Sequence, residues 1–257
     1  MNAGKRVYLA AAISSLLLTG NALASSGDEI QVYDDAIGKP GEIGLDIHAN
    51  YVPSGKKTPD WGGDAPSHHS FRVTPEFNFG LTETLEAGLY LPFLRESNGD
   101  SHLEGAKVRL KYLTAPKDSA YFWGLNGELG HVSLRSAVQR WNLEVRPIIG
   151  YKINKWQFTV NPILGFELSG THSNVPEFEP AVRASYELHE DLSVSLEHYA
   201  GLGPLNNIAP YSEQSHITYV VVDTLVAGHN VDFGVGKGWN ANSDIWTIKA
   251  IINFPIK

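Results

Sequence analysis

Charged residues recur at alternate positions inside segments whose other residues are apolar. In Lys107–Lys111, for example, a base occupies every second position, and Val108 and Leu110 lie between the bases. Such side chains can pair with one another or bind a charged solute, provided that they project into one shared space. The candidate residues of this kind are Glu76, Glu86, Lys107, Arg109, Lys111, Glu128, Arg146, Arg183, Glu197, Asp232 and Lys249.

The balance of charge in this set suggests two different uses. With Asp46, Glu144, Glu179 and Arg72 included, the set has eight acids and seven bases. Near balance indicates pairing between neighbouring segments and a narrow, salt-bridged interior. The alternative is a solute channel in which the bases at 107, 109 and 111 favour anions. The acids at 76, 86 and 128 would neutralise such a row.

The residue types of a hydrolase occur together in Ser195–His198. Ser195 and Glu197 project to one side of an extended segment and His198 projects to the other, so they cannot form a triad there. The chain has no GxSxG, no HExxH and no cysteine. The sequence therefore predicts no catalytic residue and no enzymatic activity.

Histidines and carboxylates in polar segments were considered as metal ligands. His68, His69 and His102, with His131 and His172 nearby, could share zinc or copper. Asp60, Asp64, Asn98 and Asp100 could bind calcium. No spacing defines a site, so we expect solvated side chains, no metal and no cofactor. The net charge of −8 argues against a nucleic-acid surface.

The elements that carry these residues are predicted to be β-strands. In Glu42–Tyr51 apolar and polar residues alternate over ten positions, which is the period of a strand with one apolar face. Similar patterns recur in eleven further segments, which makes about twelve strands; they lie near residues 71–79, 85–91, 106–112, 121–129, 141–146, 156–164, 178–185, 192–197, 216–221, 231–235 and 246–254. In the 216–221 segment, Ile217, Tyr219 and Val221 are assigned to the apolar face.

The connections favour a membrane barrel over a soluble β-sandwich. Long polar loops, such as Pro53–His68 and Leu202–Gln214, alternate with short turns, such as 82–84 and 223–224. Outer-membrane barrels have this asymmetry, with short periplasmic turns and a polar interior that accommodates charges. Residues 42–257 are therefore predicted to form a transmembrane antiparallel barrel of about twelve strands, with both termini periplasmic.

Residues 1–24 are predicted to be a secretory signal peptide. Lys5 and Arg6 precede a short apolar core, and Ala22–Ala24 has the small-x-small pattern of a cleavage site. Residues 25–41 are expected to be a periplasmic segment before the barrel. The predicted location is the outer membrane, where lipid, lipopolysaccharide and the barrel-assembly machinery are the expected partners.

Prolines occupy apolar-face positions in the middle of four predicted strands, at Pro75, Pro147, Pro162 and Pro180. Proline cannot donate to the backbone ladder and is usually confined to edges or bulges. The sequence therefore predicts a belt of β-bulges at one depth of the wall.

Three segments resemble a known group of bacterial barrels. They are FNFGLTETLEAGLYLPF (Phe77–Phe93), SLEHYAGLGPL (Ser195–Leu205) and DFGVGKGWNANSDIWTIKAIINFP (Asp232–Pro255). They look like uncharacterised proteobacterial outer-membrane barrels, similar to the family named after the meta-pathway of phenol degradation. The resemblance implies uptake of hydrophobic or aromatic solutes and no catalytic residue.

The expected function is thus a narrow channel or uptake barrel for small solutes that are hydrophobic, aromatic or anionic. Two alternatives stay open at this point. One is a structural or assembly-partner barrel whose interior is filled by ion pairs. The other is an outer-membrane enzyme that modifies lipid.

Overall fold

The structure is a computed structural model that describes residues 27, 29–114, 119–170 and 175–256. Every regular element in these ranges is a β-strand. No helix in the same ranges is long and apolar enough to cross a membrane. The strands are β1 (Ile43–Ser54), β2 (Phe71–Thr82), β3 (Leu85–Tyr90), β4 (Phe93–Arg95), β5 (Ser101–Leu103), β6 (Gly105–Thr114), β7 (Tyr121–Val132), β8 (Trp141–Ile153), β9 (Trp156–Asn161), β10 (Leu164–Glu167), β11 (Glu177–Phe178), β12 (Ala181–His189), β13 (Leu192–Gly201), β14 (Ser215–Val226), β15 (His229–Gly238) and β16 (Trp246–Pro255).

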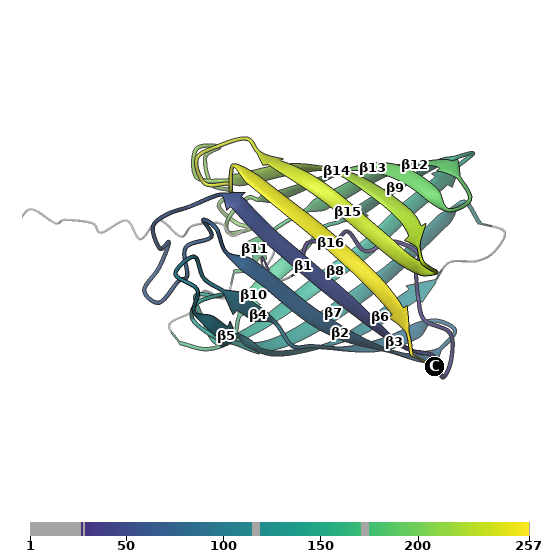
Figure 1. Ribbon diagram of the computed structural model, residues 1–257, viewed down its shortest axis with the longest axis horizontal. Helices are drawn as coiled ribbons and strands as arrows, with labels where there is room; N and C mark the ends of the chain where they lie inside the picture. Colours follow the sequence, from purple (N-terminus) through teal and green to yellow (C-terminus); the bar gives the residue numbers. More distant parts are fainter. Residues whose placement is uncertain (1–26, 28, 115–118, 171–174, 257) are drawn as a thin grey trace, which may run out of the picture.

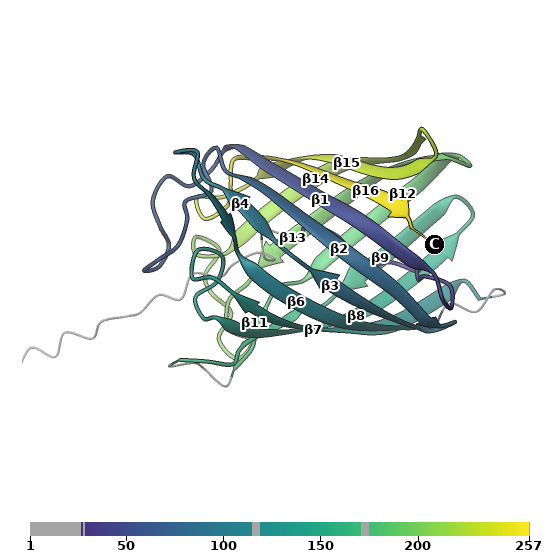
Figure 2. The same ribbon diagram turned by 60° about the horizontal axis from the view of Figure 1, so that its bottom comes forward.

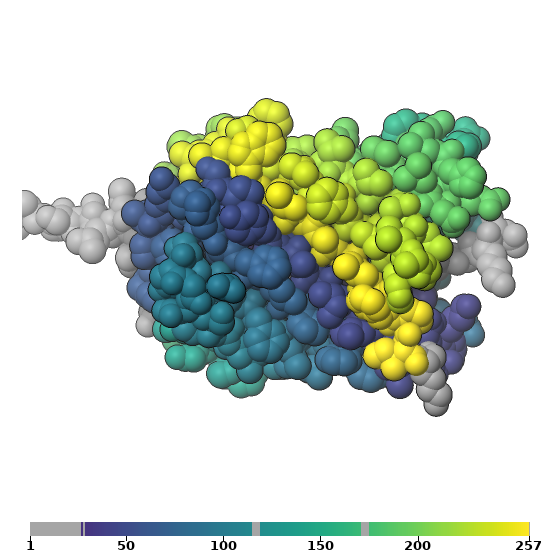
Figure 3. Space-filling view, in the orientation of Figure 1, coloured from purple at the N-terminus to yellow at the C-terminus, as the bar shows by residue number. Residues whose placement is uncertain are grey.

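The strands close into an antiparallel barrel. The twelve longer strands β1, β2, β3, β6, β7, β8, β9, β12, β13, β14, β15 and β16 pair in chain order, and β1 pairs with both β2 and β16, which seals the cylinder. Figures 1 and 2 show β1 and β16 side by side, and Figure 3 shows the purple and yellow ends of the chain meeting on the surface. The short strands β4, β5, β10 and β11 extend longer neighbours, so the wall has 12 strands, as the sequence predicted.

The period-two pattern places charges inside and apolar residues outside. On β6, Lys107, Arg109 and Lys111 are buried, whereas Val108 and Leu110 are each 51% exposed. The same alternation runs around the barrel, because a pleated strand sends successive side chains to opposite faces. The outer surface is therefore apolar, and the ionised side chains share the lumen.

The two ends of the barrel differ in their connections. We call the end with the 82–85 connection the turn end, and the end with the 55–70 connection the loop end (Figure 1). The predicted turn at Asp223–Thr224 is wrong, because β14 continues to Val226. The chain reverses at Ala227 and Gly228, whose φ angles of 51° and 84° suit a tight hairpin.

The expected proline bulges are also wrong. β8 pairs with β9 and then with β10 in one unbroken register. This register sets Pro147 opposite Pro162. The β9–β12 and β10–β11 pairings likewise set Pro162 opposite Pro180, whereas Pro75 pairs regularly with Ile47. Three prolines thus interrupt the ladder without shifting it, because they lack N–H donors but occupy ordinary strand positions.

Residues 29–38, which belong to the segment that the sequence placed before the barrel, lie inside the barrel wall. Ile30, Val32 and Tyr33 are each no more than 8% exposed. Ile30 and Val32 belong to one buried apolar cluster with Ile163, Tyr199, Tyr219 and Val221, which come from β13, β14 and the connection between β9 and β10. Tyr33 packs against Leu113, Phe122 and Ile148. We call residues 29–38 the plug.

The plug explains a second wrong assignment, that of the apolar face of β14. Tyr219 and Val221 face inward and are almost fully buried, whereas Val220 is 55% exposed on the outside. The lumen accepts apolar side chains at these positions because the plug, and not water, lies against them. Both faces of β14 are apolar for this reason, and alternation alone could not distinguish them.

Candidate functional site

The plug connects opposite walls of the barrel through its backbone. Lys249 Nζ on β16 donates to the Ile30 carbonyl at 3.2 Å, and Arg146 Nη1 on β8 donates to the Gln31 carbonyl at 3.0 Å. The strand order separates β16 and β8 by five strands in either direction, so the two donors come from diametrically opposite sides. The plug therefore spans the width of the lumen.

The Asn161 side chain bonds both backbone groups of Tyr33 in the plug. Its Oδ1 accepts from the Tyr33 N–H at 2.7 Å, and its Nδ2 donates to the Tyr33 carbonyl at 2.9 Å. Asn161 itself is fully buried. The Tyr33 hydroxyl lies 2.5 Å from that of Tyr90, and burial raises the pKa of Tyr33 well above its ordinary value. The phenol therefore remains a neutral hydrogen-bonding group at physiological pH.

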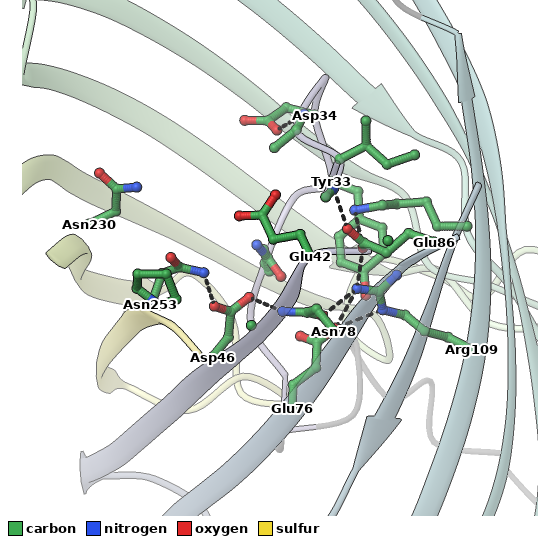
Figure 4. A pocket seen from close by; sticks show the side chains of 18 residues that line it. Tyr33, Asp34, Glu42, Asp46, Glu76, Asn78, Glu86, Arg109, Asn230 and Asn253 are labelled. Carbon is green, nitrogen blue, oxygen red and sulfur yellow. Dashed lines mark hydrogen bonds and ion pairs between the residues drawn. The ribbon is translucent and has the colours of Figure 1, made fainter. Parts of the chain in front are cut away.

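A compact ion-pair cluster lies beside the plug on β2, β3 and β6. We call Glu76, Glu86, Arg109 and Lys111 the Arg109 cluster. Arg109 bonds both carboxylates at 2.6 Å, and Lys111 lies 2.9 Å from Glu86. His48 Nε2 lies 2.9 Å from the second oxygen of Glu76, and the Gly38 N–H donates to the second oxygen of Glu86. All four carboxylate oxygens of this cluster have partners, and Figure 4 draws the contacts of Arg109 with the two glutamates.

A second cluster lies across the lumen on β12 to β16. Arg183 contacts Glu197 at 3.1 Å and also pairs with Asp223 and Asp232. Lys249 contacts Glu197 at 2.6 Å and Asp232 at 3.2 Å. Asp223 was missed from the sequence because the polar pair Asp223–Thr224 was assigned to a turn.

A third group surrounds the start of the plug. Lys107 lies 2.8 Å from Glu128, and Arg146 lies 2.7 Å from Glu144. Glu29 of the plug lies 3.9 Å from Lys107 and 3.8 Å from Arg146. The structure therefore places all eleven residues predicted from the sequence in the lumen. It divides them among three groups and does not join them into one row.

The arrangement contradicts an anion-selective row on β6. Each of its three bases has a carboxylate partner within 3 Å, at Glu128, Glu76 and Glu86. These are the acids that the sequence indicated as neutralising groups. Pairing leaves no surplus of positive charge along this strand.

Cavities remain in the lumen toward both ends of the barrel. At the turn end, a cavity of about 230 Å³ lies between the plug and β1, β2 and β16. Figure 4 shows Asp46, linked to Asn78 and Asn253, at one side of this cavity and the Arg109 cluster at the other. Nearer the loop end, a second cavity of about 260 Å³ lies against β7, β8, β10 and β11. Each of these two spaces could hold a small molecule.

The hydrolase residues considered from the sequence are kept apart. Ser195 Oγ lies 3.2 Å from Arg183, and Glu197 accepts from Tyr199 and Lys249 inside the lumen. His198 instead bonds Thr218 and His216, at 2.9 and 3.2 Å. These three residues therefore form no nucleophile–base pair.

The metal-ligand candidates are likewise dispersed. His68 and His69 stack on each other, His102 pairs with Glu96, and His131 packs at a tilt against Trp141. Asp60 and Asp64 lie in one loop, and Asn98 and Asp100 lie in another. His172 lies outside the described residues. No three histidines or carboxylates in the described ranges are arranged to hold a metal ion.

Sequence analysis missed the residues that the plug contributes, chiefly Glu29, Tyr33 and Asp35. A signal was present in the strands. Phe122, Ile148, Ile163 and Tyr199 are apolar residues at lumen positions, where a water-filled interior would favour polar side chains.

Comparison with known proteins supports the barrel fold. No family model matches the chain, and no curated protein matches it. A solved structure of the COG4313 outer membrane channel from Pseudomonas putida F1 superposes with a TM-score of 0.60 at 11% identity, over 89% of this chain and 100% of that one. LpxR from Salmonella typhimurium has a TM-score of 0.43 at 9% identity, over 82% of this chain and 99% of that one, which is too low to carry an argument. The fold is therefore that of outer-membrane barrels.

Proposed function

We propose that this protein is an outer-membrane barrel that admits small solutes through a lumen gated by the plug. The observation that carries the proposal is the attachment of residues 30–33 to opposite walls across the lumen, beside the cavity at the turn end. A segment that contacts the wall only through hydrogen bonds, ion pairs and packing can move without breaking the wall. The similarity to a solved channel supports this role over a purely structural one.

We also propose the cellular setting that the sequence predicted. The apolar outer face fits outer-membrane lipid and lipopolysaccharide, and residues 1–24 would serve as the export signal. The barrel-assembly machinery would insert the chain. The resemblance to the phenol meta-pathway barrels agrees with this setting, and the dispersed Ser195, Glu197 and His198 support a protein without enzymatic activity.

Planar-bilayer conductance tests the gate. Asn161→Ala removes both side-chain bonds to Tyr33 and leaves the strand intact. The two hydrogen bonds together stabilise the attached plug by about 1–3 kcal/mol. Their loss should therefore raise the fraction of time for which a barrel conducts by roughly tenfold or more. The measurement compares current traces of the parent and the variant at equal protein density.

Thr159→Val is the matched control. Thr159 is buried two residues earlier on the same strand, and its Oγ1 has no hydrogen-bond partner among the described residues. It should conduct like the parent. If neither the parent nor Asn161→Ala conducts although both are folded, the structural barrel is the better description.

A further inference from the structure

The cavity nearer the loop end has acidic polar walls. Five glutamates line it, at positions 128, 144, 167, 177 and 179, and Lys107 is the cation among its described lining residues. Arg146 balances Glu144 from outside the lining. Neither Glu177 nor Glu179 forms an ion pair within the described part of the chain. An excess of carboxylates around one space favours a cationic occupant.

A buried carboxylate at this cavity has an unused oxygen. Glu128 is 6% exposed, and its Oε1 meets Lys107 at 2.8 Å. Its Oε2 is buried and has no hydrogen-bond partner among the described residues, as is also true of Glu177 Oε2. Leaving a buried carboxylate oxygen unbonded is costly, and a donor in the cavity would remove that cost.

The remaining walls are apolar and match a carbon skeleton rather than a hydrated ion. Pro92, Val132, Ala137, Val138, Leu143 and Phe166 contribute them. The volume of about 260 Å³ suits a molecule about the size of one aromatic amine. A metal ion is a poorer match, because the described carboxylates are not arranged as a coordinating group.

We propose that this cavity binds a small organic cation: an ammonium group on an apolar or aromatic body. The ammonium lies among Glu128, Glu177 and Glu179, and the body lies against Val132 and Phe166. This inference names a solute class for the proposed uptake role. It replaces the anionic class that the sequence suggested.

Calorimetric titration of the detergent-solubilised protein tests the inference with three probes of one shape. They are 2-phenylethylamine, neutral 2-phenylethanol and anionic phenylacetate. We expect the amine to bind at least about tenfold more tightly than either of the others, because only it pairs with the glutamates. Equal affinities, or tighter binding of phenylacetate, would overturn the proposal. Binding of calcium in competition with the amine would show a cation site of a different class and would also overturn it.

Two variants locate the site. Glu179→Gln should weaken amine binding about tenfold or more without affecting 2-phenylethanol, whereas Glu213→Gln, in a loop away from the cavity, should have no effect. Gly165→Val tests the location without changing charge. A Cβ at Gly165 would lie 3.7 Å from Glu179 Oε2 and 3.9 Å from Glu177 Cβ, so a branched side chain enters the cavity. It should abolish binding of the amine. Unchanged binding in both Glu179→Gln and Gly165→Val would refute the assignment.

The outcome is separable from that of the conductance experiment. Amine binding to a barrel that never conducts would leave the cavity site intact and remove the gated channel. Conductance without amine binding would keep the channel and remove the organic-cation site.

Discussion

The Arg109 cluster and the loop-end cavity contain similar side chains in different proportions. In the Arg109 cluster, two acids meet two bases, and every carboxylate oxygen has a partner. Around the cavity, acids outnumber bases, and buried oxygens of Glu128 and Glu177 have no partner among the described residues. The first arrangement fixes neighbouring strands and the plug. The second leaves bonding capacity for another molecule.

We expect the largest loss of stability from a substitution in the Arg109 cluster. Arg109→Ala leaves Glu76 and Glu86 buried without their shared cation. Removing one partner of a buried ion pair costs about 3–5 kcal/mol. Urea unfolding in detergent, followed by tryptophan fluorescence, should show this loss. Arg140→Ala, an exposed change at the loop end, should unfold like the parent, and an equal midpoint for the two variants would contradict our description of the cluster.

A matched pair of glutamate variants sharpens the comparison. Glu76→Gln weakens charge-assisted bonds to Arg109 and His48 and should cost about 1.5–3 kcal/mol. Glu179→Gln relieves repulsion from Glu144 and Glu177, so stability should change by no more than about 0.5 kcal/mol or increase. The same urea titration measures both. If Glu179→Gln is the more damaging change, the cavity glutamates are structural and the contrast between the regions fails.

The smallest effect is expected at the turn-end rim. Lys152 pairs with Asp35 of the plug, but its side chain is 45% exposed. Solvated ion pairs contribute about 0–1 kcal/mol. Lys152→Ala should therefore barely shift the unfolding midpoint, and adding salt to the parent should mimic it. A loss as large as that of Arg109→Ala would show that the plug is anchored at its exposed end.

The strands and their faces were predictable because alternation is a local property of the sequence. Lys107, Arg109 and Lys111 needed only their two-residue spacing to be placed inside. The pairing among strands required the register, which short patterns do not contain. Asp223 illustrates this limit, because its partner Arg183 lies on a strand that is not adjacent in the barrel.

The plug was not predictable from alternation because it is not a strand. Residues 29–38 have no period, and their burial depends on a lumen that exists only after the barrel closes. The signal for a segment inside the lumen lay in the strands, in inward-facing apolar residues such as Ile148 and Val221. An apolar side chain at a lumen position that would otherwise face water indicates that another segment of the chain covers it.

The pairing of β1 with β16 has a consequence for how the molecule is made. These strands lie at opposite ends of the chain, so the last wall contacts to form are those with the greatest sequence separation and the highest entropic cost. The plug leads directly into β1, where the Gly41 N–H bonds the Gly80 carbonyl. One continuous segment of the chain therefore fills the lumen and then supplies one side of the final seam.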